Sequence, residues 1–163
     1  MTHKDAIVSR LLTLPPFAGD PQEPRIRYNR RWLFMYYLTG IGMKLYNSYR
    51  HWLVIDDYKV LFEYAVRRDG FEACRNAELP IYFEDELVGD ATHTTDLLVN
   101  GNVMMMLYRQ SDIGDPERHI LESHLSLTHT QFGFIGNFGE DQFYSEWYIR
   151  DPQNARIERV KLM

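Results

Sequence analysis

The spacing of apolar residues changes along the chain, from helical periodicity to alternating and continuous runs. Over residues 56–68 (DDYKVLFEYAVRR), apolar positions recur at helical intervals, and Gly70 follows them. Acidic residues stand at the start of this stretch and arginines at its end, as the helix dipole prefers. The pattern predicts an amphipathic helix over residues 56–68.

A longer helix is predicted from Asn29 to about Arg50, where aromatic residues fall on more than one helical face. Gly40 and Gly42 weaken the middle of such a helix by about 1 kcal/mol each relative to alanine. Upstream, residues 1–13 favour a short helix, and the prolines between positions 15 and 24 favour an extended arm. The domain is therefore expected to carry an N-terminal extension that is helical and proline-rich.

The rest of the chain consists mainly of short apolar runs separated by turn residues, a pattern typical of strands. Asn100-Gly101 is a two-residue hairpin turn between two of these runs, and residues 117–127 have a helical pattern after Pro116. Strands are predicted at 78–83, 87–99, 102–109, 131–138, 143–150 and 155–162. The core order α, β, β, β, α, β, with extensions at both ends, predicts a layered α/β domain.

Composition limits the classes of protein that this chain can belong to. Its 163 residues and mass of 19.4 kDa fit one domain. Eighteen basic against 23 acidic residues give a net charge of −5, so a basic nucleic-acid binder is not expected. The single cysteine, Cys74, excludes an internal disulfide framework and a cysteine-rich zinc site.

The longest apolar run, residues 32–43, is shorter than the ~20 residues that a membrane-spanning helix needs. A buried or interfacial helix is predicted instead, with a membrane-proximal contact through 32–43 as an option. Lys4, Asp5 and Arg10 interrupt the apolar core that a signal peptide requires, so no cleaved signal is expected. We expect an intracellular location, in the cytoplasm or in an organelle such as the mitochondrion.

Most candidate catalytic or metal-binding patterns lack the required spacing. His119, His124 and His129 lie five residues apart, which is not the spacing that points two helical ligands at one metal. Asp96 is different, because it stands near the end of an extended segment just before a tight hairpin into an apolar strand. In metal-dependent nucleases an acid at this place binds Mg²⁺, and an acid and a lysine on the next strand complete the site.

Several stretches resemble, in order and spacing, the GxxExxY family, a compact group in the PD-(D/E)xK nuclease-like superfamily. They are 63–71 (EYAVRRDGF), 79–83 (LPIYF), 86–89 (ELVG), 95–99 (TDLLV), 133–139 (GFIGNFG) and 155–160 (ARIERV). The resemblance covers about residues 45–161. It implies a compact restriction-endonuclease-like αβββαβ core at 45–163, preceded by an arm and aromatic helix at 1–44.

The chain departs from the family at the positions that carry its chemistry. The glycine, glutamate and tyrosine that name the family correspond to Asp56, Lys59 and Phe62. The acid and lysine of the strand after the hairpin correspond to Met106 and Tyr108, and a helical glutamine falls near Ile120. The resemblance thus implies a degenerate site at Lys59, Asp96, Met106 and Tyr108, of which only Asp96 keeps the family's residue type.

One carboxylate cannot hold Mg²⁺ tightly against water, and the thioether of Met106 is a poor ligand for a hard cation. One hypothesis is that Lys59 pairs with Asp96, so that its ammonium group replaces the charge of the metal. A second is that a migrated acid, Glu63 or Asp90, restores a site. We expect no cofactor, no bound metal and no catalytic residue.

The expected function is that of a pseudoenzyme, a non-catalytic structural subunit that binds other proteins in a larger multiprotein complex. The aromatic helix offers the candidate contact residues, because Trp, Tyr and Arg dominate interface anchors. These are Arg30, Arg31, Trp32, Phe34 and Tyr37. The alternative for the aromatic residues is that they complete the core of the chain itself.

Two other functions stay open at this point. The chain would be a metal-dependent nuclease if a site is restored. It would be a nucleic-acid-binding protein if the basic stretch at 25–31 (RIRYNRR) contacts phosphates.

Overall fold

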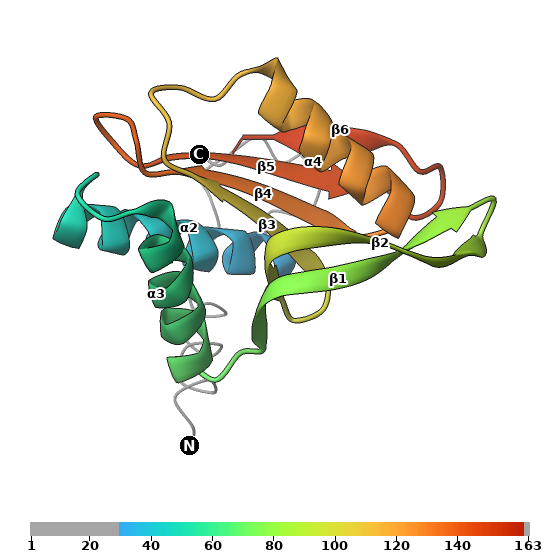
Figure 1. Ribbon diagram of the computed structural model, residues 1–163, viewed down its shortest axis with the longest axis horizontal. Coiled ribbons are helices and arrows are strands. Elements are labelled where there is room, and N and C mark those ends of the chain that lie inside the picture. Colours follow the sequence, from blue (N-terminus) through green and yellow to red (C-terminus); the bar gives the residue numbers. More distant parts are fainter. Residues whose placement is uncertain (1–29, 162–163) are drawn as a thin grey trace, which may run out of the picture.

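The computed structural model of the chain describes residues 30–161, and within them the side chains from Leu33 onward. The helix predicted at 1–13 and the proline-rich arm lie outside the described residues. The helices are α2 (Arg30–Tyr49), α3 (Ile55–Arg68) and α4 (Asp115–Thr128), and the strands are β1 (Ala73–Phe83), β2 (Glu86–Val99), β3 (Val103–Tyr108), β4 (Phe132–Asn137), β5 (Tyr144–Arg150) and β6 (Ile157–Val160) (Figure 1). The predicted α/β class and the order of its elements are confirmed.

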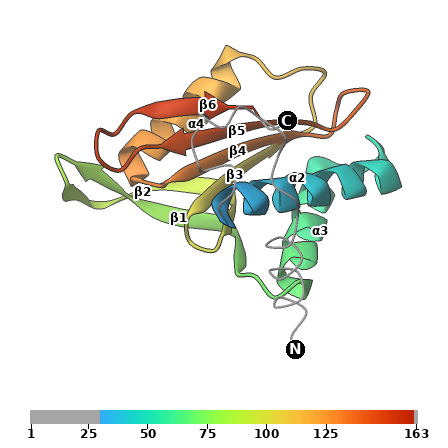
Figure 2. The ribbon, with the colours of Figure 1, turned by 180° about the vertical axis from the view of Figure 1, so that it is seen from behind.

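The strands form one six-stranded sheet in the order β1-β2-β3-β4-β5-β6. Strands β3 and β4 are parallel, and helix α4 provides the connection between them, whereas the other neighbouring strands are antiparallel. Helices α2 and α3 lie on one side of the sheet and α4 lies on the other (Figures 1 and 2). The central strands are therefore covered on both faces.

This double coverage explains the composition of the two parallel strands. All residues of β4 are buried, and β3 is buried at four of its six positions, so both read as continuous apolar runs. Gly133 belongs to this packing, because a Cβ there would lie 2.7 Å from Cδ1 of Leu125 on α4. Gly133 thus has a role in how closely α4 approaches the sheet.

Helix α2 packs into the same core as the sheet. Met35, Leu38 and Ile41 are buried on it, and Nε1 of Trp147 on β5 donates a hydrogen bond to Oγ1 of Thr39 at 2.9 Å. The helix runs without a break past residues 44 and 45, where the predicted arm meets the predicted domain. Tyr46, beyond that point, is buried in the same core.

Strands β1 and β6 begin more than one residue away from their predicted starts. Strand β1 begins at Ala73 rather than 78, because residues 73–77 pair with the end of β2 although their own sequence (ACRNA) is mostly polar. Strand β6 begins at Ile157 rather than 155. Ala155 has a φ of 59° and donates its N–H to the carbonyl of Asp151, so it belongs to a turn.

The apolar run at 32–43 lies within α2. Among the helices of residues 30–161, none is long and apolar enough to cross a membrane.

The two glycines of α2 provide a matched test of this packing. Gly40 is exposed, and a Cβ there has nothing within 4 Å, whereas a Cβ on Gly42 would overlap the ring of Phe143. Gly40→Ala should raise the free energy of unfolding by about 1 kcal/mol through helix propensity alone. Gly42→Ala should lower it by about 1 kcal/mol or more, because overpacking outweighs the propensity gain. Urea unfolding measures both, and a stabilised Gly42→Ala would contradict the close contact between α2 and Phe143.

Candidate functional site

The four positions of the predicted degenerate site line one cleft of about 510 Å³. Lys59 comes from the first half of α3, Asp96 from β2, and Met106 and Tyr108 from β3. The lining is completed by Leu107 of β3, by two residues that follow this strand and by two at the start of α3, namely Arg109, Gln110, Val54 and Ile55. The structure therefore brings together residues that the sequence separates by up to about fifty positions.

Local structure explains why these side chains meet. The pairing of β2 with β3 ends at Leu97 and Met105, and just beyond this pair the backbone N–H of Leu107 reaches the Asp96 carboxylate. Helix α3 is fixed over the same end of the sheet by Tyr58, whose buried ring stacks on Phe138 with centroids 4.1 Å apart. Lys59 follows Tyr58 on the next face of the helix, and its ammonium group reaches Asp96 on β2.

The carboxylate of Asp96 has both oxygens engaged. Nζ of Lys59 lies 3.0 Å from Oδ1, and the backbone N–H of Leu107 donates a hydrogen bond to Oδ2 at 2.8 Å. The side chains of Lys59 and Asp96 are only 19% and 20% exposed, so water screens their attraction less than on an open surface. The predicted pairing of Lys59 with Asp96 is confirmed.

The two positions on β3 supply neither a carboxylate nor a cation. Met106 is partly buried, with its sulfur 3.7 Å from Oγ1 of Thr95. Burial, followed by the negative charges of Asp96 and Glu117, raises the pKa of Tyr108 to about 12. The phenol therefore stays protonated and neutral at physiological pH, and neither residue replaces the chemistry of an acid or a lysine.

A divalent metal ion does not fit this donor set. Its one carboxylate is bound by an ammonium group and a backbone N–H, and the neighbouring side chains are a thioether and a neutral phenol. Nowhere in residues 30–161 do three His, Cys, Asp or Glu side chains gather in a way that could hold a metal. We therefore derive no metal-dependent step at this cleft.

Neither acid named as a migrated ligand lines the cleft. Glu63 accepts hydrogen bonds from the backbone N–H of Arg75 at 2.9 Å and from its Nε at 3.2 Å. Asp90 is exposed on β2, in the part of the β1–β2 hairpin that extends beyond the sheet. Ile120, at the position of the family's glutamine, is 44% exposed on α4.

Two of the proposed contact residues on α2 pack against the core. Phe34 and Tyr37 surround Phe71, with ring centroids 4.9 and 5.1 Å from it, and both are partly buried. The Tyr37 hydroxyl donates a hydrogen bond to the Asp69 carboxylate. Burial and this neighbouring carboxylate raise the pKa of Tyr37. The side chains of Arg30, Arg31 and Trp32 lie outside the described residues.

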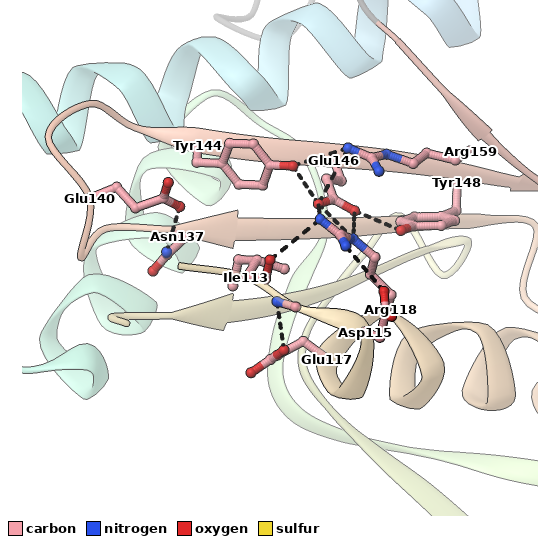
Figure 3. A network of polar contacts seen from close by, with 11 residues as sticks. Ile113, Asp115, Glu117, Arg118, Asn137, Glu140, Tyr144, Glu146, Tyr148 and Arg159 are labelled. Atoms are coloured by element: carbon pink, nitrogen blue, oxygen red, sulfur yellow. Dashed lines mark hydrogen bonds and ion pairs between the residues drawn. The ribbon is translucent and has the colours of Figure 1, made fainter. Parts of the chain in front are cut away.

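A buried polar network between helix α4 and strand β5 was not predicted from the sequence (Figure 3). The Glu146 side chain on β5 is fully buried, and Arg118 on α4 approaches both of its oxygens, at 2.8 to 3.0 Å. The hydroxyls of Tyr144 and Tyr148 donate hydrogen bonds to the same carboxylate at 2.5 and 2.7 Å. Nη2 of Arg159 lies 3.5 Å from Oε2 of Glu146. The available signal was an acid among aromatic residues within a predicted strand (YSEWYIR).

The network keeps Glu146 ionised. Burial alone would raise the pKa of its carboxyl group, but hydrogen bonds from Arg118, Tyr144 and Tyr148 outweigh that effect and lower the pKa to about 2. Because its oxygens are already occupied by these donors, the carboxylate holds α4 against the sheet and offers no free position for a ligand. We assign it a structural role.

Residues 34–149 match the family profile described as the PD-(D/E)XK nuclease superfamily. The match covers more than half of the sequence, so the chain belongs to this superfamily. Its helices and mixed sheet are consistent with the restriction-endonuclease-like fold expected from the sequence. The match begins within α2, ahead of the resemblance noted from residue 45. No curated protein and no solved structure gave a significant match.

The ion pair of the cleft can be tested by a double-mutant cycle. Asp96→Ala leaves both the Lys59 ammonium and the Leu107 N–H without their partner, and should lower the free energy of unfolding by about 1–3 kcal/mol. Lys59→Met should lower the free energy of unfolding by less, because Asp96 keeps its hydrogen bond from the Leu107 N–H. In the double variant the loss should be smaller than the sum of the two single losses.

Asp56→Ala is the matched control, since Asp56 also lies near Lys59, at 3.9 Å, but is 87% exposed. Its effect should stay within about 0.5 kcal/mol. Strictly additive single effects would mean that Lys59 and Asp96 do not interact.

The buried carboxylate makes stability depend on acid pH. Because folding lowers the pKa of Glu146 from 4.5 to about 2, its stabilising contribution is complete above about pH 5 and is lost as pH falls toward 2. Glu146→Gln should be less stable at neutral pH and should lose less stability on acidification. Urea midpoints between neutral and acid pH measure this difference, with the 65% exposed Glu158→Gln as control. Equal acid sensitivity of wild type and Glu146→Gln would contradict the assignment.

Proposed function

We propose that this chain is a non-catalytic structural subunit of a larger protein assembly, built on a nuclease fold whose catalytic groups have been replaced. We also propose that it belongs to the GxxExxY group of the superfamily, with a degenerate site. The observation that carries the proposal is the ion pair between Lys59 and Asp96, because it occupies the one carboxylate that a metal ion would require.

Chemistry at the cleft supports this proposal. Metal-dependent hydrolysis of a phosphodiester needs a cation that stabilises developing negative charge and a group that activates water. Asp96 is already neutralised by Lys59, Met106 has no basic atom, and the phenol of Tyr108 is neutral because its pKa is about 12. A general base should have a pKa near the working pH, so these residues offer no efficient route to an attacking hydroxide.

The surface supports a role in protein contacts. Trp52, Tyr64 and Phe83 are 78%, 62% and 69% exposed, although large aromatic side chains are usually buried. Aromatic residues are enriched at protein interfaces, where they fill pockets of the partner. We propose that some of these side chains are covered by other subunits.

Membership of a nuclease superfamily is the observation that favours the second candidate function, a metal-dependent nuclease or nucleic-acid-binding protein. The two functions differ in what they require of Asp96. A nuclease requires its carboxylate as a metal ligand, whereas the proposed subunit uses it only to anchor Lys59.

Purification from the native source tests the proposal. The chain should elute in a stable complex much larger than its own 19.4 kDa, together with other protein chains. Neither Mg²⁺ nor Mn²⁺ should induce cleavage of DNA or RNA that depends on Asp96, so wild type and Asp96→Ala should give the same background.

A monodisperse monomer at every stage of purification would contradict the subunit role. Metal-dependent cleavage that Asp96→Ala abolishes would establish the nuclease instead. Binding to nucleic acid that weakens steeply with salt, without cleavage, would point to a nucleic-acid-binding protein.

A further inference from the structure

The β1–β2 hairpin forms an acidic projection at one end of the molecule. We call its outer part, residues 78–90, the acidic hairpin. It contains Glu78, Glu84, Asp85, Glu86 and Asp90, and no lysine or arginine occurs between positions 76 and 92. Apolar side chains at its tip are exposed as well: Phe83 by 69%, Leu87 by 61% and Val88 by 43%.

The acidic hairpin is held in a defined direction by contacts at its base. The ring of Tyr82 on β1 stacks on His129, just after α4, with centroids 4.6 Å apart. His93 on β2 stacks on His124 of α4 at 4.0 Å. Both strands of the hairpin are thus fixed to the same helix, so the apolar tip is presented without a large loss of conformational freedom on binding.

A groove of opposite charge lies between α2 and α3. This basic groove has a volume of about 230 Å³, and Leu45, Leu61 and Ala65 contribute apolar surface to it. Lys44 and Arg68 are the charged residues that line it, and no acidic side chain does so. Arg68 lies over the ring of Tyr64, 6.0 Å from its centroid, and its Nε is 4.0 Å from the buried Asp69.

The acidic hairpin lies at one end of the molecule, and helices α2 and α3, which line the basic groove, lie at the other (Figures 1 and 2). The hairpin therefore cannot reach the groove of its own chain, whereas the hairpin of a second copy can. One chain carries both halves of a complementary pair: an apolar tip surrounded by acids, and an apolar groove bordered by cations. Nucleic acid and anionic membranes do not suit the hairpin, because its charge repels them.

We propose that the acidic hairpin of one copy docks in the basic groove of a second copy, with Phe83 and Leu87 as the apolar anchors. Such a contact joins different surfaces of the two copies, so it produces head-to-tail rings or filaments rather than a two-fold dimer. This inference rests on the proposed function, because it names a second copy of the chain as one partner in the assembly.

Sedimentation velocity on the purified full-length chain tests the contact. At low salt the average sedimentation coefficient should rise with protein concentration, and added salt should reverse the rise because charge attraction contributes to it. A hairpin variant, Phe83→Ser with Leu87→Ser, and a groove variant, Lys44→Glu with Arg68→Glu, should each associate about tenfold more weakly or not at all.

Mixing the two variants gives the most specific result. Each variant keeps the surface that the other has lost, so an equimolar mixture has one intact contact and should form a one-to-one dimer that does not grow further. Ile120→Ser and Arg156→Glu are controls, because both residues lie outside the two surfaces. Ile120 is 44% exposed, and the side chain of Arg156 is 75% exposed. Neither control should change the association.

A wild-type chain that stays monomeric at all concentrations would overturn the inference, as would a mixture that remains monomeric while wild type associates. Should the hairpin variant lose its circular dichroism spectrum, Glu84→Lys with Glu86→Lys at the exposed turn of the hairpin replaces it. Failure here is distinguishable from failure of the proposed function. A chain that is monomeric alone but co-purifies with other proteins is still a subunit, without the head-to-tail contact.

Discussion

The ion pair between Lys59 and Asp96 is the interaction on which this account of the molecule depends. It joins helix α3 to strand β2, and the backbone N–H of Leu107 brings strand β3 into the same contact. In a metal-dependent nuclease a cation bound from solvent would neutralise this acid. Here the cation belongs to the chain itself, so the charge is neutralised as soon as the protein folds, and the contact serves stability.

A second carboxylate is neutralised in a similar way between α4 and β5. Arg118 of α4 binds Glu146 of β5, as Lys59 of α3 binds Asp96 of β2. In both cases a helix supplies the cation and a strand supplies the acid, so each pair ties a covering helix to the sheet. Burial of a charge is costly unless it is paired and hydrogen-bonded, and both acids accept further hydrogen bonds. The fold thus uses its inward-facing acids to position helices.

Much of this arrangement could be predicted from the sequence, by local patterns and by a family resemblance. The amphipathic spacing of 56–68 indicated α3, and Asn100-Gly101 indicated the turn between β2 and β3. The resemblance to the GxxExxY family then placed Lys59 and Asp96 in one site, which led to the hypothesis that they pair. The Glu146 network could not be predicted in this way, because no family position marked Glu146 or Arg118 and only the crossing of α4 over the sheet brings them together. The early start of β1 was missed for a similar reason: its polar first residues are held by their partner strand.

The central claim is that the Lys59 ammonium takes the place of a divalent metal ion at Asp96. Titration of the isotopically labelled chain with Mn²⁺, followed by nuclear magnetic resonance, tests it most directly, because a bound paramagnetic ion broadens the signals of nearby amides. The account predicts that the amide signals of Asp96 and Leu107 broaden no more than those of exposed acidic positions such as Asp90. Selective broadening of Asp96 and Leu107 at low Mn²⁺ concentration, reversed by Mg²⁺, would contradict it.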